Sequence, residues 1–269
     1  MLTSPNDSIG IGTDNDVCTI TLNRPSSLNA LNLDMVSALL DITTKLKDAS
    51  DIRAIILQGA GDHFMAGGDV KGFKTLLDEE KKTSIIRRAF EDELEDVHRT
   101  IINMRTLPIP IIASARGAVA GAGLSFLLAC DLAICSENTI LTLAYRHIGT
   151  SPDGGSTYFL PRTIGLKKAM EVALLGDRFD AQQAFDLGLV NCVVPDKLLA
   201  KETKLIAERL AKGPAYALGE TKKLINGSLN ANLVEQLTAE TKAFVNCAIR
   251  KDFYEGVCAF TEKRPPNFE

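Results

Sequence analysis

The chain has 269 residues, a formal net charge of −4 at pH 7 and an apolar fraction of 45%. This length and composition can bury one large core, either in a single α/β domain or in a domain with a helical appendage. No long basic run is present, which argues against a nucleic-acid-binding surface, because such surfaces hold phosphates with Lys and Arg.

Other sequence features bear on compartment and metal binding. The N-terminal residues lack the basic flank and apolar core of a signal peptide, and the longest uncharged apolar stretch, residues 118–130, is too short to span a bilayer. Six cysteines are scattered without CxxC spacing, and only three histidines are present. We therefore expect a cytoplasmic protein with reduced, mostly buried cysteines, no metal site and no membrane-spanning segment.

Strand and helix patterns alternate along the first half of the chain. Residues 17–22 are rich in β-branched side chains, which predicts a strand, and Asn32 can cap the helix that follows it. Apolar residues at helical spacing predict a further long helix over residues 86–101. A buried strand is predicted at residues 54–58, and further strands are predicted at residues 109–113 and 132–135. This alternation is typical of βα units with crossover connections.

Beyond about residue 195 the apolar repeats have helical spacing throughout. They predict one helix over residues 199–210, which Gly213 and Pro214 break, and a later helix over residues 233–248. We therefore divide the chain into an α/β core, residues 1–195, and a C-terminal helical region, residues 196–269.

Two glycine-rich segments carry the strongest chemical signal. They are MAGGDVKGF at residues 65–73 and GAVAGAGLSF at residues 117–126, and each precedes a predicted helix start. Glycine permits sharp turns and close approach of a ligand to the backbone, and a helix start presents unpaired N–H groups. Two such turns facing one point would form an oxyanion hole for an enolate or a tetrahedral intermediate. Either turn alone is weak evidence, since most glycine-rich turns are only turns.

Together with other short motifs, the two turns identify a resemblance to a known family. The motifs are LNRP at 22–25, LNAL at 28–31, CDLAI at 130–134, IGTSPDGG at 148–155, LPR at 160–162 and EKRPP at 262–266. The chain resembles the crotonase (enoyl-CoA hydratase/isomerase) superfamily over nearly its whole length. Within it, SPDGGST at residues 151–157 is most similar to the ring-opening epoxyphenylacetyl-CoA isomerases.

The resemblance implies an architecture and a substrate. It implies an α/β spiral of ββα units, with a C-terminal helical region that covers the active site or a subunit interface. It also implies assembly as a homotrimer or a dimer of trimers. The substrate would be an acyl-CoA thioester, so that coenzyme A belongs to the substrate and no separate cofactor is expected.

The resemblance further assigns roles to individual residues. The backbone N–H groups of Gly68 and Ala122 would hold the thioester oxygen. Hydratases of the family carry two catalytic glutamates, and the matching positions here are Ser125 and Tyr145, neither of them a carboxylate. The carboxylate that remains is Asp153, which could move a proton between two carbons but could also only cap a helix. We favour the catalytic role.

Further positions are assigned to substrate binding by the same resemblance. The residues expected around the acyl-CoA are Arg24, Ser27, Leu28, Ala30, Ala66, Gly67, Asp69, Val70, Gly121, Ser125, Tyr145, Phe260 and Lys263. The last two are expected to reach the CoA nucleotide, either within one subunit or from a neighbouring one. Asp69 is more suited to fixing the first glycine turn than to proton transfer.

The resulting hypothesis is an acyl-CoA isomerase that shifts a double bond or rearranges a ring through an enolate, with Asp153 as proton shuttle. One alternative is an enoyl-CoA hydratase with displaced acid and base groups, and another is a non-catalytic acyl-CoA-binding subunit. A dehalogenase of this family would use Asp153 as nucleophile and His98 as base. It would also need a tryptophan, and this chain has none.

Overall fold

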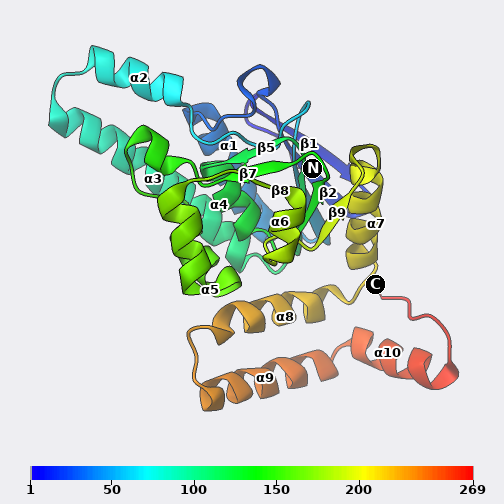
Figure 1. Cartoon of the computed structure of the whole chain (residues 1–269). Helices are drawn as coiled ribbons and strands as arrows, with labels where there is room; N and C mark the ends of the chain where they lie inside the picture. The colour runs from blue at the N-terminus through cyan, green and yellow to red at the C-terminus, as the bar shows by residue number, and fades with distance from the viewer. Residues whose placement is uncertain (1, 269) are drawn as a thin grey trace.

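Two β-sheets carry the fold of this computed structural model, which describes residues 2–268 (Figure 1). The larger sheet has the strand order β1-β2-β3-β4-β6-β9, and the smaller has the order β5-β7-β8. The strands are β1 (Ile9–Asp14), β2 (Val17–Leu22), β3 (Ala54–Gly59), β4 (Ile111–Ala115), β5 (Ala118–Ala120), β6 (Leu132–Ser136), β7 (Ile140–Thr142), β8 (Phe179–Asp180) and β9 (Cys192–Val194).

Most neighbouring strands are parallel, so they need long crossover connections. Among the strands of residues 2–268, only β1 with β2 and β7 with β8 pair antiparallel. The helices are α1 (Leu33–Lys45), α2 (Val70–Glu79), α3 (Thr83–Thr106), α4 (Ala122–Ala129), α5 (Ser156–Leu175), α6 (Ala181–Asp186), α7 (Leu199–Ala211), α8 (Ala215–Ser228), α9 (Leu233–Ala248) and α10 (Lys251–Glu262). This mixed α/β architecture with helices at its C-terminal end confirms the predicted fold class.

Alternation along the strands divides the core between the two faces of the large sheet. On β3, Ile55 and Leu57 belong to the main buried cluster, together with side chains of α1, α3 and α4. Ala54 and Ile56 point to the other face, where they pack with Ala207 and other residues of α7. The large sheet is therefore covered on both sides, as expected for parallel strands.

The predicted strands and helices agree with the structure, except that one strand begins later than expected. The Asn32 side chain accepts a hydrogen bond from Met35 N at 3.1 Å, so it caps α1 as expected. The strand predicted at residues 109–113 instead begins at Ile111. Pro110 has no N–H to donate to a ladder, and its carbonyl only accepts from Ile55 N before regular pairing starts.

After residue 195 the described residues form helices, but these helices have two different settings. Helix α7 lies on the large sheet, whereas α8, α9 and α10 form a separate layer beyond it (Figure 1). A buried Lys222 anchors α8, since its Nζ lies 2.7 Å from Asp131 Oδ2 and donates to the carbonyl oxygens of Met104 and Ile109. The domain boundary at residue 195 stays a prediction. No helix within residues 2–268 combines the length and apolarity needed to cross a membrane.

Candidate active site

The two glycine-rich turns lie against each other. Met65 N donates to Ala118 O at 3.1 Å, and Ala120 N donates to Met65 O at 2.9 Å, so the first turn pairs with β5. A Cβ placed on Gly121 would lie 3.5 Å from Gly67 Cα. Both glycines have positive φ, +103° at Gly67 and +50° at Gly121, which a side chain would strain. The backbone conformation at both positions therefore favours glycine.

Unpaired N–H groups follow each glycine. Ala122 is the first residue of α4, and Gly68 stands two residues before α2. Within residues 2–268, neither Gly68 N nor Ala122 N donates to another protein group. The Phe73 ring packs against Gly68, where an added Cβ would lie 2.9 Å from its Cζ. The two turns thus present free donors beside an apolar ring, the kind of arrangement an oxyanion hole requires.

Asp153 is joined to both uncharged positions, Ser125 and Tyr145. The Tyr145 hydroxyl donates to Asp153 Oδ1 at 2.6 Å. The Ser125 hydroxyl donates to the backbone carbonyl of Asp153 at 3.0 Å, and Ser156 Oγ donates to the same oxygen, also at 3.0 Å. These bonds connect the start of α5 to α4, the helix that begins at Ala122. Asp153 is therefore held at its carboxylate by Tyr145 and at its backbone carbonyl by the two serines.

The Asp153 side chain does not cap α5. The N-cap of α5 is Gly155, with φ +82°, and it makes no side-chain capping bond. The only hydrogen bond that the Asp153 carboxylate makes within the described part of the chain comes from Tyr145. The interpretation of Asp153 as a helix cap is therefore wrong, and its carboxylate has no structural task of that kind.

Burial sets the ionisation of this pair. It raises the pKa of the Asp153 carboxyl above its ordinary value, although the Tyr145 hydrogen bond and the charge of His98 act in the opposite direction. Burial also raises the pKa of the Tyr145 phenol, and the charge and hydrogen bond of Asp153 add to the effect. Tyr145 therefore stays a neutral donor, while Asp153 has the raised basicity that a proton acceptor needs.

Several residues expected to bind acyl-CoA meet at the first glycine turn. Arg24 pairs with Asp69 at 2.9 Å and donates to Ala30 O, and Ala66 N donates to Leu28 O at 3.0 Å. Ser27 ends the short 3₁₀ turn just before Leu28. This loop, the first glycine turn and the start of α2 therefore form one unit.

Asp69 fixes that unit rather than standing free. Its side chain caps α2 by accepting from Gly72 N at 3.2 Å. Partial burial acts to raise the pKa of Asp69, but the Gly72 and Arg24 hydrogen bonds hold it below its ordinary value. Val70, next in the chain, begins α2 and is exposed.

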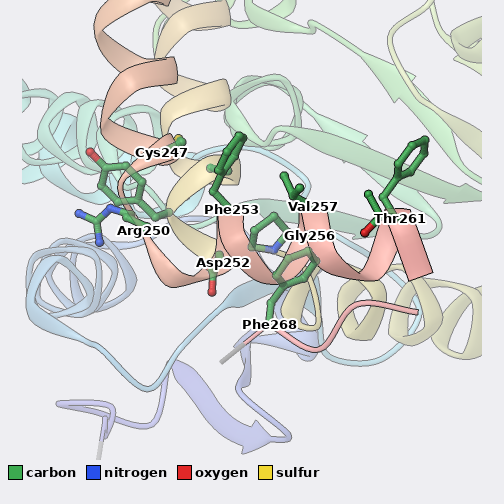
Figure 2. A pocket seen from close by; sticks show the side chains of 12 residues that line it. Cys247, Arg250, Asp252, Phe253, Gly256, Val257, Thr261 and Phe268 are labelled. Atoms are coloured by element: carbon green, nitrogen blue, oxygen red, sulfur yellow. The ribbon is translucent and has the colours of Figure 1, made fainter. Parts of the chain in front are cut away.

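Phe260 and Lys263 belong to the C-terminal helices and not to the first glycine turn. Phe260 is on α10 and Lys263 is its C-terminal cap, at the end of the molecule away from α2 and α3 (Figure 1). Phe260 lines an apolar cavity of about 430 Å³ between α8, α9 and α10, around which Phe253, Val257 and Phe268 also lie (Figure 2). One chain alone does not bring these two residues to Asp153.

Two of the three histidines have structural partners. His63 Nδ1 accepts from Ala118 N at 3.0 Å, which ties the loop before the first glycine turn to β5. His147 Nε2 lies 3.1 Å from Gly176 O. His98 is exposed on α3, and its charge reaches Asp153. No group of three or more His, Cys, Asp or Glu side chains in residues 2–268 is arranged to hold a metal ion.

Three residues near the site were not among the predicted site residues. Buried Asn29 donates to Ala60 O and His63 O and accepts from Arg24 N, so it holds the first loop in place. In the sequence, Phe73 is notable only as the last residue of the first glycine-rich segment. Glu93 interrupts the apolar face of the helix predicted over residues 86–101, and that irregularity was the signal available for it.

The spiral of crossover units and the two adjoining glycine turns are those of the crotonase superfamily. A family model described as enoyl-CoA hydratase/isomerase matches residues 12–269. The chain therefore belongs to the enoyl-CoA hydratase/isomerase family and is an enzyme of that family.

Different relatives are named for different activities. A protein of Rhodobacter capsulatus named "Probable enoyl-CoA hydratase" is 36% identical over 251 residues, which cover 93% of each chain. The 1,2-epoxyphenylacetyl-CoA isomerase of Escherichia coli is 34% identical over 252 residues, 94% of each chain. The crystal structure of an enoyl-CoA hydratase from Polaromonas sp. JS666 superposes with a TM-score of 0.91 at 31% identity, covering 97% of this chain and 99% of that one.

Proposed function

We propose that this protein is an acyl-CoA isomerase that shifts a double bond or rearranges a ring through a thioester enolate. The observation that carries the proposal is the Asp153 carboxylate. It is half-buried, free of any capping bond and hydrogen-bonded at 2.6 Å to a neutral tyrosine. It lies next to α4, whose first residue, Ala122, presents a free N–H. No cofactor beyond the CoA of the substrate enters this chemistry.

In the proposed reaction the N–H groups of Gly68 and Ala122 stabilise the enolate oxygen. Removing one such donor in other enzymes costs on the order of 3 kcal/mol of transition-state stabilisation. The same stabilisation acidifies the carbon beside the carbonyl, so that a carboxylate can remove a proton from it. Asp153 supplies that base, and a proton delivered to another carbon completes the shift.

The hydratase alternative lacks support at the two positions where the family's hydratases carry glutamates. The Ser125 hydroxyl is committed to the Asp153 carbonyl, and the Tyr145 phenol is neutral with a raised pKa. Neither group can take a proton from water at neutral pH. Because some relatives are named as hydratases, hydration of crotonyl-CoA is measured alongside isomerisation.

The test compares Asp153→Asn with Ser125→Ala. The amide keeps the shape of the turn and removes the base, so turnover of enoyl-CoA isomers should fall by a factor on the order of 10² to 10⁴ with acyl-CoA affinity nearly unchanged. Ser125→Ala should cost far less, because Ser156 still donates to the Asp153 carbonyl.

Three results would contradict the proposal. One is near-normal isomerase turnover in a folded Asp153→Asn variant. A second is hydration of crotonyl-CoA by the unmodified enzyme without exchange of α or γ protons in D₂O, which would indicate a hydratase. The third is acyl-CoA binding with neither activity, which would indicate a binding subunit.

We also propose that the protein assembles as a homotrimer or a dimer of trimers. Large apolar side chains at the end of α9 and on α10 are exposed in the single chain: Ile249, the C-terminal cap of α9, has 81% and Phe260 on α10 has 86% of its possible exposure. In such an assembly Phe260 and Lys263 would approach the CoA nucleotide bound by a neighbouring subunit. A role in fatty-acid or aromatic-acid metabolism and a cytoplasmic location are part of the same proposal.

A further inference from the structure

Glu93 stands out among the acidic residues of α3. Glu91 and Asp92 face Arg87 and Arg88 at 3.8 and 3.7 Å, and Asp96 faces Arg99 at 3.6 Å. Glu93 is half-buried, yet no cation or hydrogen-bond donor in residues 2–268 pairs with it. A carboxylate that leaves water without a partner is costly, so the position calls for an explanation.

The helix register places Glu93 on the face of α3 that looks toward the site. Phe90, Glu93 and Val97 are spaced by three and four residues, so they lie on one helix face. At one end of this face, the Phe90 ring packs edge-on against Phe73, with 5.2 Å between centroids, and Phe73 covers Gly68. At the other end, Val97 is buried in the main core cluster. Glu93 lies between these two contacts.

The charges that act on Glu93 also indicate that it lies near the candidate active site. Burial raises the pKa of its carboxyl, and the charges of Asp153 and Asp69 raise it further. Asp69 follows Gly68 in the first glycine turn, whereas Asp153 precedes α5. Glu93 is therefore within electrostatic reach of both the first turn and the proposed base. Both effects favour the protonated form of Glu93, as does any further drying of the site by an acyl chain.

We propose that Glu93 is the second acid–base residue of this site, and that it delivers the proton that ends the double-bond shift. This inference rests on the proposed isomerase function and on Asp153 as the base. It replaces a shuttle made of one carboxylate with a pair of carboxylates on two different elements.

The proton balance for a 3-enoyl-CoA is as follows. The Asp153 carboxylate takes a proton from C2, and the electron pair of that C–H bond forms the enolate, whose oxygen is held by the two N–H groups. The enolate then re-forms the carbonyl and a C2–C3 double bond, while the former C3–C4 π electrons take a proton from the Glu93 carboxyl at C4. Proton transfer from Asp153 to Glu93 restores the starting state without any other reactant.

The experiment follows the fate of deuterium in a single turnover of trans-3-hexenoyl-CoA dideuterated at C2. With two carboxylates, Asp153 retains the deuteron and Glu93 supplies a proton, so the C4 of the product should carry no deuterium. In Glu93→Gln only Asp153 remains, so turnover should fall by a factor on the order of 10² or more and deuterium should appear at C4. Glu91→Gln, on the exposed side of the same helix, should behave like the unmodified enzyme.

The outcomes separate this inference from the proposed function. If Asp153→Asn is inactive while Glu93→Gln keeps normal turnover, Glu93 has no catalytic role and the isomerase proposal stands. Transfer of deuterium from C2 to C4 by the unmodified enzyme would likewise overturn the two-carboxylate scheme alone. An unmodified enzyme that neither isomerises the probe nor exchanges its C2 deuterium overturns both.

Discussion

The hydrogen bond between Tyr145 and Asp153 joins the two residues on which the ionisation of the site depends. The phenol donates to the carboxylate at 2.6 Å and remains a donor because its own pKa is raised. This bond favours the charged form of Asp153, and burial disfavours it. The balance between the two sets the pH above which Asp153 can act as a base.

Tyr145→Phe should move the acidic limb of the kcat/KM profile to higher pH. The base acts only when ionised, so activity is lost as pH falls through the pKa of Asp153. Burial already holds that pKa above the ordinary aspartate value, and removing the Tyr145 hydrogen bond takes away a contribution that lowers it. An ordinary aspartate has a pKa of about 4. The acidic limb of the unmodified enzyme should lie above that pH, and the limb of the variant should lie higher still.

The matched control is Tyr158→Phe, which removes an exposed phenol whose oxygen, within the described residues, accepts a hydrogen bond from Asn230 alone. Its acidic limb should coincide with that of the unmodified enzyme. A Tyr145→Phe limb that moves to lower pH, or does not move, would mean that Asp153 does not control the profile.

How far the sequence could predict the site depends on the residue. Gly68, Ala122 and Asp153 belong to local motifs, so a one-dimensional pattern could locate them. Whether Asp153 caps a helix could not be decided in that way, because the answer lies in the left-handed Gly155 that takes the N-cap position. The contribution of Glu93 depends on how α3 packs beside residues distant in sequence, which no local pattern contains.

At the scale of elements, the main requirement is close approach of α4 to the first glycine turn. A Cβ on Gly123 would lie 2.2 Å from Met65 O, far inside contact distance. Met65 is also the residue whose N–H and carbonyl pair with β5. Gly123, the third glycine of the segment 117–126, therefore sets the spacing between the two turns.

Gly123→Ala should destabilise the fold and impair the site together. The added methyl must push α4 away from the Met65 backbone, and overpacking of this kind costs about 1–3 kcal/mol in the free energy of unfolding. The same movement separates Gly68 N from Ala122 N, so kcat should fall at temperatures where the variant is still folded. Thermal unfolding and steady-state kinetics measure the two effects.

Gly12→Ala is the control for this change. Gly12 is an exposed residue of β1 and has no atom within 4 Å of an added Cβ, so its variant should stay within about 0.5 kcal/mol of the unmodified protein. Equal stability of the two variants would show that the approach of α4 to Met65 is not tight in solution.

The sequence predicted the central elements well and the edges less well. Strands such as β3 carry an unbroken β-branched or aliphatic run, which signals a buried parallel strand without any tertiary information. Strand β1 reads IGIGTD, where glycines weaken the pattern, and it is held by antiparallel pairing with β2. Strand β8 has two residues and exists only through its contact with β7.

For the whole molecule, the exposed apolar faces of the C-terminal helices are the main unexplained feature of a single chain. The apolar repeats that predicted α9 are present, but Leu233 is 72% exposed and Phe244 is 65% exposed. A helix on the surface of a globular protein normally turns such an apolar face toward the core. Several large exposed apolar side chains in one region are typical of a contact with another protein surface, here proposed to be a second copy of the chain.

Ile249→Glu should therefore dissociate the assembly without unfolding the chain. Ile249 is 81% exposed in the single chain, so a charge there costs little in the monomer, whereas burying it between subunits would be strongly unfavourable. Light scattering at micromolar concentration should give a trimer or hexamer mass for the unmodified protein and a smaller mass for the variant. Far-ultraviolet circular dichroism should show the same helix content in both.

Leu77→Glu provides the comparison, because it makes the same chemical change at an exposed position on α2, away from the C-terminal helices. It should leave the mass unchanged. A monomer mass for the unmodified protein would contradict the proposed assembly outright. A variant at Ile249 that keeps the full mass would move the interface to another surface. The proposed approach of Phe260 and Lys263 to a neighbouring nucleotide would then lose its basis, since both residues lie on the same C-terminal layer as Ile249.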